Sequence, residues 1–450
     1  MQYDTQSTNI LSGVQQMDAT KESRSILGNF NVSVGDSIVF ICFFILLTSL
    51  ILIKAVLLTS EAAFSTFWTG YGLIVSLFLL SRIPYAYLYE DSHDTVYKDH
   101  EYPDVSAIVA AKNEEAGIYR TIQHVIESDY PGKIECIVIN DGSTDNTGDE
   151  ILRARADFGE QVRPVMFEVN KGKREAMAIG IQEARNEILV FIDSDSYVSP
   201  RGIRHLAEHF IAEPGIGAIS GNTKVENAEE NLMAKMQSIQ YSISFDIYKT
   251  CESVHRSVTC CPGCFSAYRR VAVVPFFNQW KSQAFLGSKG NFGDDRALTT
   301  FVLKKWDIIY CEKARATTIV PNSFRVYWKQ QLRWKKSWIR EGVLAAAHMW
   351  KRHPLASIGF YIHFTFPFLG PILAINVLLY SIATGNVLIF PLFMVGFVLI
   401  GMTFALFVRL YRRAINFLYM PFFSILFVSV LIWQMPYAIL TVRKNHWGTR

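Results

Sequence analysis

The sequence predicts a doubly wound α/β domain joined to an α-helical transmembrane region. Its composition is split. Residues 36–90 and 355–442 are strongly apolar and aromatic, whereas residues 100–324 are charged and interrupted by turn residues, as in an ordinary soluble domain. Within this middle part, short apolar runs typical of buried strands alternate with helical segments. That alternation favours helices on both faces of a largely parallel sheet.

The N-terminal region divides into a tail and two apolar runs. Residues 1–35 are polar and lack an apolar period, so we expect a disordered cytosolic tail. The runs 37–59 and 64–89 both exceed the ~20 residues that cross a bilayer. The link between them, 60–63, contains no Lys or Arg, which places it outside the cell. We therefore expect a transmembrane hairpin over 36–90 and a cytosolic domain after it.

The middle domain shows its strands and helices in regular order. Apolar, β-branched runs predict strands at 105–111, 135–140, 163–169 and 187–192, and helices follow at 114–128, 145–157 and 173–185. A longer amphipathic stretch, 231–256, is expected to be a helix that packs over the sheet. Ligands of such sheets bind where the strands end. Because the motifs 140–143 and 193–195 both follow predicted strand ends, we expect a ligand there.

The C-terminal part of the chain returns to the membrane. Residues 325–354 are basic and predict amphipathic interface helices, and 360–384 and 387–406 predict two further spans. The last apolar stretch, 417–442, is interrupted by two prolines and has basic residues beyond both ends. Because basic residues favour the cytosolic side, both ends are expected there, which suits a re-entrant segment.

Charge and cysteine content narrow the function classes. The net charge of +4 is too small to indicate nucleic-acid binding, and the basic residues gather near membrane borders, which suits anionic lipid. The seven cysteines include the run Cys260-Cys261-Pro262-Gly263-Cys264, but no second pair follows in the spacing of a structural zinc site. We expect the cysteines of a cytosolic domain to be reduced.

Two acidic motifs suit a nucleotide and its metal ion. Asp193 and Asp195 lie on the same side of an extended segment, and paired carboxylates can hold a divalent cation beside a diphosphate. We assign Asp195 as a metal ligand, Asp193 to the metal or the ribose, and Asp141 as the acceptor for an N–H of the base. The start of a helix that carries several cations suits a phosphate group. The cations here are Lys171, Lys173 and Arg174. The alternative for each motif is a solvated turn.

The motif Gly293-Asp294-Asp295-Arg296 suits the opposite half of a transfer reaction. An alcohol that attacks an anomeric carbon needs a general base within hydrogen-bond reach, and Asp295 is the candidate. Asp294 and Arg296 would shift its pKa in opposite directions. The alternative is an acidic N-terminal pair that only stabilises the helix at 296–304.

The basic stretch contains the motif 330–334, with the sequence Gln-Gln-Leu-Arg-Trp. On a helix, Gln330, Arg333 and Trp334 share one face through their i, i+3, i+4 spacing. The planar guanidinium of Arg333 suits a diphosphate, the indole of Trp334 suits a sugar ring, and the amide of Gln330 suits hydroxyls. The remaining cations are interpreted as a surface that lies on the membrane; they are Lys329, Lys335, Lys336 and Arg340.

These four motifs, in this order, resemble processive, membrane-integrated family-2 glycosyltransferases. The resemblance is close over 100–345 and looser over the membrane segments. Within that family the chain is most similar to hyaluronan synthases, and the supporting stretches are 170–174, 285–287, 293–299, 330–337 and the terminal 447–450. It departs at Asn140, where many members have Asp, and in the loop 262–266, which is closer to chitin-type synthases.

The resemblance implies a Rossmann-like GT-A domain that transfers sugars from UDP donors with inversion and uses Mg²⁺ or Mn²⁺. It implies UDP-GlcNAc and UDP-GlcA as donors, with a nascent polysaccharide and membrane lipid as the other partners. It also implies that Asp295, beside Asp294, deprotonates the acceptor, and that Asp193 and Asp195 hold the metal.

The resemblance further assigns residues to the donor, the acceptor and a gate. The donor side is expected to comprise Ala110, Asn113, Glu114, Asp141, Lys171, Lys173, Arg174, Asp193, Gln330, Arg333 and Trp334. The acceptor side is expected to comprise Cys264, Asp294 and Trp334. The C-terminal residues Trp447, Gly448, Thr449 and Arg450 are expected to form a cytosolic gating segment.

Three alternatives stay open at this point. A chitin-type polymer of GlcNAc needs one donor where hyaluronan needs two. The glucuronate carboxylate of hyaluronan should require a cation, which Arg269, Arg270 or Arg296 could supply. A polyprenyl-phosphate sugar transferase would add one sugar and stop, and the full 330–334 motif disfavours it. A membrane scaffold with an inactive nucleotide fold is disfavoured because its key residues are all present: Asp141, Asp195, Asp295 and Arg333.

Overall fold

The computed structural model describes residues 66–91, 97–289, 293–412 and 415–444, with a few single positions before residue 50. Three predicted segments lie outside the described residues. They are the tail 1–35, almost all of the first apolar run 37–59, and the gating segment 447–450.

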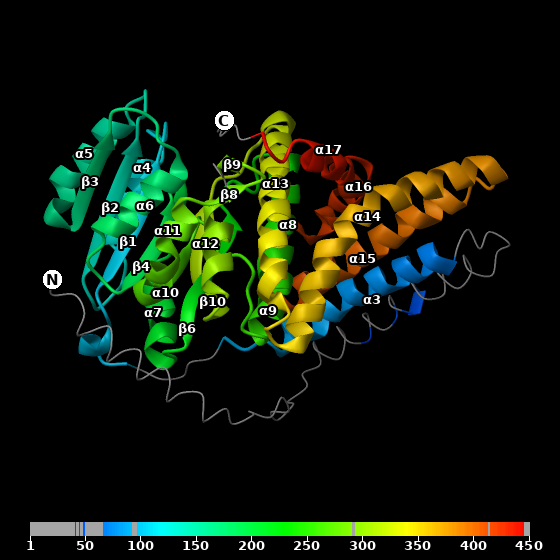
Figure 1. The fold of residues 1–450 in the computed structure, drawn as a ribbon, viewed down its shortest axis with the longest axis horizontal. Coiled ribbons are helices and arrows are strands. Elements are labelled where there is room, and N and C mark those ends of the chain that lie inside the picture. The colour runs from blue at the N-terminus through cyan, green and yellow to red at the C-terminus, as the bar shows by residue number, and fades with distance from the viewer. Residues whose placement is uncertain are drawn as a thin grey trace.

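An eight-stranded mixed sheet forms the centre of the middle domain (Figure 1), with the strand order β3-β2-β1-β4-β7-β6-β10-β5. The four predicted strands are present and pair in parallel, as β1 (Val105–Ala111), β2 (Ile134–Asp141), β3 (Val162–Phe167) and β4 (Ile188–Asp193). The rest of the sheet was not predicted. It consists of β5 (Ser196–Val198), β6 (Ile216–Val225), β7 (Ser266–Arg269) and β10 (Asp307–Thr318).

The second half of the sheet is mixed because β7 runs antiparallel to both of its neighbours, β4 and β6. Strand β10 then pairs in parallel with β6 and antiparallel with β5. Its pairing brings the end of β10 beside the turn that follows β4. The doubly wound parallel expectation is therefore correct for the N-terminal half of the sheet and incomplete for the other half.

Helices cover both faces of the sheet, so the central strands are buried on both sides. The predicted helices are found as α4 (Ile118–Ile126), α5 (Thr147–Phe158) and α6 (Lys173–Glu183), and α7 (Gly202–Ala212) adds a fourth. One apolar cluster joins α6 and α12 (Asp294–Val302) to the sheet, and a second joins α4, α5 and α7 to its other face. The expected helix 231–256 is present but contains a π turn: α8 (Leu232–Ile243), η4 (Ser244–Lys249) and α9 (Thr250–Val254).

Long apolar helices extend away from the sheet (Figure 1). These are α3 (Thr66–Leu88), α14 (Pro354–Thr384) and α15 (Ile389–Arg412), and all three contact one another. By length and composition, four described stretches could cross a membrane. They are Gly70–Leu88, Pro354–Thr384, Ile389–Arg409 and Asn416–Leu440. The second, third and fourth apolar runs of the sequence are thus found as helices where they were expected.

The last apolar stretch is broken rather than straight. It comprises η6 (Ile415–Tyr419), α16 (Met420–Ser429), η7 (Leu431–Trp433) and α17 (Gln434–Leu440). Both of its ends contact the sheet-bearing domain. Asn416 Nδ2 donates to Glu229 Oε1 over 3.0 Å, and Arg443 donates to the carbonyl of Leu286 through Nε and Nη2 over 3.0 and 2.8 Å. Two ends on one side of the apolar helices favour a re-entrant path.

Helix α13 (Phe324–Met349) stands between the sheet and the apolar helices (Figure 1). Of the four cations expected on a membrane surface, Lys329 is exposed, but the other three contact protein atoms instead. Lys335 Nζ donates to Leu431 O and Gln434 Oε1, both over 2.8 Å. Lys336 and Arg340 are buried, and Arg340 pairs with Glu341 over 2.7 Å. Lys335 and Lys336, which also donates to the carbonyl of Lys444 over 3.4 Å, bind α13 to the C-terminal segment, whereas the partner of Arg340 lies in α13 itself. The C-terminal segment thus covers part of the face that the sequence pattern left to lipid.

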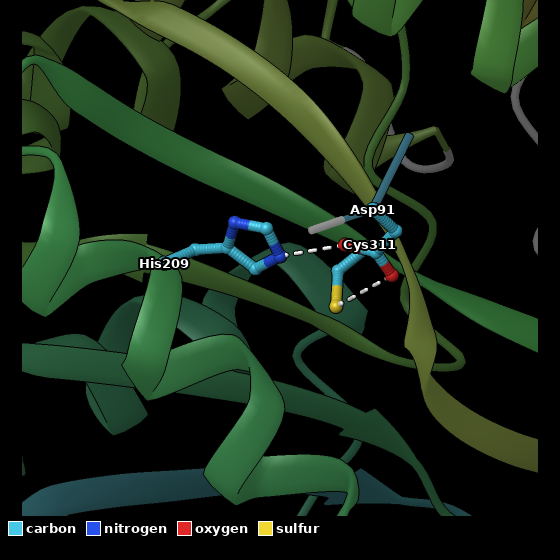
Figure 2. Close-up of side chains that lie close together, drawn as sticks. All are labelled: Asp91, His209 and Cys311. Atoms are coloured by element: carbon cyan, nitrogen blue, oxygen red, sulfur yellow. Dashed lines mark hydrogen bonds and ion pairs between the residues drawn. The ribbon is translucent and has the colours of Figure 1, made fainter. Parts of the chain in front are cut away.

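A buried polar cluster ties the end of α3 to the sheet (Figure 2). Asp91 follows α3, His209 lies in α7 and Cys311 in β10. His209 Nε2 lies 2.8 Å from Asp91 Oδ1, and the Lys313 amide and the Cys311 thiol donate to Oδ2 over 2.7 and 3.6 Å. Burial works to raise the pKa of Asp91, but these hydrogen bonds outweigh it and hold the pKa below its usual value. The carboxylate therefore links the apolar region to the catalytic domain in its charged form.

Replacing Asp91 with Ala should lower the free energy of unfolding by about 2 kcal/mol or more, because it leaves buried donors unsatisfied. Thermal unfolding in detergent measures the change. Asp99→Ala, at an exposed position, is the matched control and should be neutral. Equal melting temperatures for Asp91→Ala and the parent chain would contradict the proposed link.

Candidate active site

The end of strand β4 carries an ion pair. Asp193, the last residue of β4, lies beside Ala110 of β1 in the sheet register. The ammonium of Lys173, at the start of α6, pairs with Asp193 Oδ1. Burial works to lower the pKa of Lys173, but the negative charge of Asp193, with smaller effects of Asp295 and Asp294, outweighs it and raises the pKa above its usual value. Two predicted donor residues thus meet at this edge.

The next strand end holds the loop 170–172 in place. Asp141, the last residue of β2, accepts from the amides of Lys171 (2.6 Å) and Gly172 (2.9 Å). It is only 1% exposed, and burial raises its pKa. Asp141 therefore positions the lysine-bearing loop, and the predicted contact with a base N–H would have to use the lone pairs that these amides leave.

A hydrogen-bonded turn surrounds the expected nucleotide position. Asn140 Oδ1 accepts from the backbone N–H of Ser143 over 3.0 Å. The side-chain oxygen of Asn can accept this hydrogen bond as well as that of an Asp. Asn113 has a φ of 54°, and its side chain accepts from the Thr144 amide over 2.9 Å. The backbone N–H of Glu114 donates to Thr147 Oγ1 over 2.8 Å. Three segments that follow strands or precede helices are thus joined into one rim.

Asp193 and Asp195 fit a divalent metal ion by the chemistry of their donor atoms. Carboxylate oxygens are the ligands that Mg²⁺ and Mn²⁺ favour. Thr318 Oγ1, at the end of β10, lies 3.5 Å from Asp195 Oδ1 and orients it. The ammonium of Lys173 already shows that a cation is accepted by Asp193. Both residues therefore remain our candidates for the metal ligands.

The cluster of Asp91, His209 and Cys311 is separate from the proposed metal site at Asp193 and Asp195. Its ligand atoms lie within 4.8 Å of one another, close enough for an ion. However, β10 from Tyr310 to Thr318 runs beside β6 from Ser220 to Val225, which is five residues or about 16 Å at ~3.3 Å per residue. The cluster therefore lies far from Asp195 and cannot supply the metal of a donor site.

A buried ion pair fixes the start of α12. Arg174 Nε donates to Asp294 Oδ1 over 2.5 Å, and both side chains are almost fully buried. Trp280 completes the arrangement, because its indole N–H donates to the carbonyl of Asp294 over 3.0 Å. The predicted contact of Arg174 with donor phosphates, and that of Asp294 with the acceptor, is not what the structure shows. Both side chains face inward, where they position the helix.

Asp295 occupies the accessible side of the same helix start. Its Oδ2 accepts from the Gly263 amide over 3.2 Å, and its Oδ1 accepts from the Arg296 amide over 2.8 Å. Asp295 is partly exposed, and Gly293 before it has a φ of 75°. The left-handed glycine turns the chain into α12, so that one aspartate points inward and the next outward.

Helix α13 brings the third motif to these carboxylates. Arg333 acts electrostatically on Asp193, Asp295 and Asp294, although burial is the larger effect and lowers its pKa. Among the described residues its guanidinium makes no hydrogen bond or ion pair, so it is available to an anion. Trp334 is 39% exposed, and its ring centroid lies 6.4 Å from that of Tyr241. Gln330 Oε1 is buried without a partner in the described chain.

In the part of the chain that the structure describes, the cysteine run is not part of a group of ligand atoms close enough to hold one metal ion. Cys260, Cys261 and Cys264 are free thiols, and burial raises the pKa of Cys261 and of Cys264 to about 12. Cys264 Sγ lies 3.1 Å from Thr223 Oγ1. Protonated thiols are poor metal ligands. Cys264 is buried beside Asp193, which agrees with a place near the transfer site but leaves little of its surface for a sugar.

Sequence reasoning missed several residues of this site. The Gly263 amide and Tyr241 became visible only through the fold. A Cβ on Gly293 would lie 1.8 Å from Ser337 Oγ, so α13 packs directly on the start of α12. The glycine inside an acidic motif was the one available signal of such a close approach.

Comparisons with known proteins agree with the fold and with a glycosyltransferase. Residues 106–276 match the model of "Glycosyl transferase family 2". The chain is 28% identical to a hyaluronan synthase of Streptococcus pyogenes over 412 residues, 90% of this chain and 96% of the relative. It is 30% identical to an N-acetylglucosaminyltransferase of Azorhizobium caulinodans, over 77% of this chain and 87% of the relative.

A solved structure gives the same fold. A mannosyltransferase from Pyrobaculum calidifontis, in complex with GDP-Man and Mn²⁺, superposes with a TM-score of 0.56 at 18% identity, over 88% of this chain and 99% of that one. The likeness confirms the GT-A fold.

Replacing Arg174 with Gln should lower the free energy of unfolding by about 3–5 kcal/mol, because it leaves the Asp294 carboxylate buried and unpaired. Thermal unfolding measures this loss. The control is Lys281→Gln, which removes a partly exposed ion pair with Glu175, a residue that lies in α6 like Arg174. This substitution should lower the free energy of unfolding by less than about 1 kcal/mol. Similar losses for the two variants would refute the positioning role of Arg174.

Proposed function

The chain belongs to glycosyltransferase family 2, and we propose that it is a processive, inverting enzyme that polymerises UDP-activated sugars and passes the polymer across the membrane. We propose UDP-GlcNAc and UDP-GlcA as its donors and hyaluronan as its product. The hyaluronan synthase relative supports this, because the match extends beyond the catalytic domain and covers 96% of that protein.

The observation that carries the proposal is the meeting of three distant motifs. Lys173 and Arg333 both act on Asp193, Asp294 and Asp295, which come from separate parts of the chain. Two cations suit a diphosphate, and an accessible carboxylate beside them suits an acceptor hydroxyl. The exposed ring of Trp334, which borders the same place, suits the face of a sugar.

The proposed reaction is one in-line displacement. Lys173 and Arg333 bind the diphosphate and stabilise the charge that develops on it as it leaves. Asp295 accepts the proton of the acceptor hydroxyl while that oxygen attacks the anomeric carbon. The bond from that carbon to the diphosphate oxygen breaks, and UDP leaves with the electron pair. The Gly263 amide holds the Asp295 carboxylate in position. A metal on Asp193 and Asp195 would neutralise further charge on the leaving group.

The apolar helices support a proposal for the location of the protein and for translocation of the polymer. Four stretches are long and apolar enough to cross a membrane, and α13 joins them to the transfer site. We propose a multi-pass membrane protein whose catalytic domain lies in the cytosol, where the nucleotide sugars are. The segment 447–450 is proposed to gate the site from the C-terminal side.

A second product deserves the same test. The N-acetylglucosaminyltransferase relative, at 30% identity, and the loop 262–266 both favour a polymer of GlcNAc alone. Such an enzyme needs no site for a carboxylate-bearing sugar. A polyprenyl-phosphate transferase is a weaker candidate, because Arg333 and Trp334 offer a diphosphate and a sugar site together.

The purified protein should release UDP and form polymer only when UDP-GlcNAc and UDP-GlcA are supplied together, with Mg²⁺ or Mn²⁺. Products are sized and digested with hyaluronidase and with chitinase, and chelator-treated protein serves as the metal control. Polymer from UDP-GlcNAc alone, sensitive to chitinase, would replace hyaluronan with the second product.

Asp295→Asn should reduce sugar transfer by about 10²- to 10⁴-fold, because the amide cannot accept the proton. UDP binding, measured by titration calorimetry, should stay within about twofold. Asp157→Asn, on α5 away from the site, is the control. An equal loss of UDP binding would make Asp295 a donor ligand instead of the base.

A further inference from the structure

A cavity lies between the catalytic domain and the apolar helices, and nothing above assigns it a role. Its walls come from α3, α9, α12, α13 and α14, and its volume is about 50 Å³. Arg296 of α12 and Arg82 of α3 both line it. Asp295 does not line the cavity, but Arg296 follows it directly on α12, so the cavity borders the helix that carries the proposed base. An acceptor chain that reaches Asp295 could extend toward it.

The Arg296 guanidinium has no partner in the part of the chain that the structure describes. Only its backbone N–H is hydrogen bonded, to Asp295 Oδ1. Arg296 is partly buried, and burial works to lower its pKa, but the groups around it, among them Asp295, Glu252 and Glu341, outweigh burial and raise the pKa. No described carboxylate forms an ion pair with it, so its N–H groups are left for an anionic ligand.

Arg82 of α3 lines the same cavity and likewise forms no described ion pair. It lies in the candidate span Gly70–Leu88, where a charged side chain is costly and indicates function. Its described hydrogen bonds go to neutral atoms: Cys251 Sγ (3.0 Å), Ser81 Oγ (3.2 Å) and the Phe78 carbonyl (3.3 Å). No described carboxylate pairs with it.

The two carboxylates of the cavity, Glu252 and Glu341, act on Arg296 electrostatically, but among the described contacts neither forms an ion pair with Arg296 or Arg82. Glu341 accepts from Arg340 (2.7 Å) and Gln283 (2.9 Å). Glu252 accepts from the Thr259 amide and hydroxyl over 3.0 and 2.9 Å. Burial beside His353 and Arg82 lowers the pKa of His255 to about 4, so His255 is uncharged at neutral pH. The cavity thus presents two guanidinium groups and two carboxylates that are already hydrogen bonded elsewhere.

We propose that Arg296 and Arg82 form an acceptor subsite that binds the carboxylate of a hexuronate residue in the growing chain. The proposal rests on the function proposed above and specifies its acceptor. A guanidinium matches a carboxylate with two parallel hydrogen bonds. The volume admits a carboxylate group in place of a few water molecules.

The structure separates Arg296 from the other arginines that could bind such a carboxylate. Arg269 donates to the carbonyls of Ile216 (2.9 Å) and Phe210, and Arg270 donates to that of Ala184. Both are used to hold the sheet edge, which leaves them unavailable. A polymer of GlcNAc has no carboxylate, so this subsite would select a uronate-containing chain. A polyprenyl phosphate shares the anionic chemistry and is therefore an arm of the test.

The test measures binding, so it does not depend on catalysis. The full-length protein in detergent is titrated by tryptophan fluorescence with three probes. These are a GlcNAc–GlcA tetrasaccharide, the same tetrasaccharide with its carboxylates reduced to alcohols, and a short-chain polyprenyl phosphate. The variants are Arg296→Gln, Arg296→Lys and Arg82→Gln, and Arg153→Gln on the exposed face of α5 is the matched control.

We expect the parent chain to bind the native tetrasaccharide more tightly than the reduced one. Arg296→Gln should weaken the native probe by about 10- to 100-fold and leave the reduced probe unchanged. Arg82→Gln should act in the same direction, Arg296→Lys should retain part of the preference, and Arg153→Gln should retain all of it. Because the guanidinium has no partner, Arg296→Gln should not lower the melting temperature.

Three outcomes would overturn the subsite. The parent chain could bind both tetrasaccharides equally, Arg296→Gln could weaken both to the same extent, or only the polyprenyl phosphate could bind in an arginine-dependent way. Failure of the proposed function has a different signature, since chitinase-sensitive polymer from UDP-GlcNAc alone would appear in the donor assay, whatever the binding data show.

Discussion

The buried ion pair between Arg174 and Asp294 is the constraint on which the site depends. It joins α6, which starts at the donor edge of the sheet, to α12, which carries the proposed base. Two adjacent aspartates thereby receive opposite environments. Asp294 is 2% exposed and paired, whereas Asp295 is partly exposed and held only by backbone N–H groups. One acidic dipeptide therefore provides both a structural anchor and a chemical group.

Helix α13 transmits this arrangement to the apolar helices. Its Ser337 packs on Gly293, its Arg333 reaches the carboxylates, and its Lys335 is bonded to the C-terminal segment. The same helix borders the cavity that contains Arg296 and Arg82. A shift of α13 would therefore change the transfer site and the cavity together. This coupling is what an enzyme needs if it must release UDP and move its acceptor in the same cycle.

Much of the fold followed from periodicity and punctuation alone. The parallel strands β1 to β4 and helices α4 to α6 have strong local patterns, and the predicted ranges differ from the structure by a few residues at most ends. Strands β6, β7 and β10 were missed, because their polar and small residues pack against distant segments rather than forming apolar runs. The prediction that the basic face of α13 lies on the membrane was wrong for Lys335 and Lys336 for the same reason, because both contact α17 or the residues beside it in the fold.

The sequence by itself determined the chemistry that the chain has available. Its motif order indicated carboxylates for a metal and a base, cations for a diphosphate and an indole for a sugar, and the length of the apolar runs indicated membrane helices. Only the tertiary structure decided which members of each motif face the site. Arg174 and Asp294 face inward, Asp141 accepts from backbone amides, and Arg296 lines a cavity without an ion pair to any described residue. The physical reason is that side-chain direction and burial depend on packing between segments far apart in the chain, which no local spacing records.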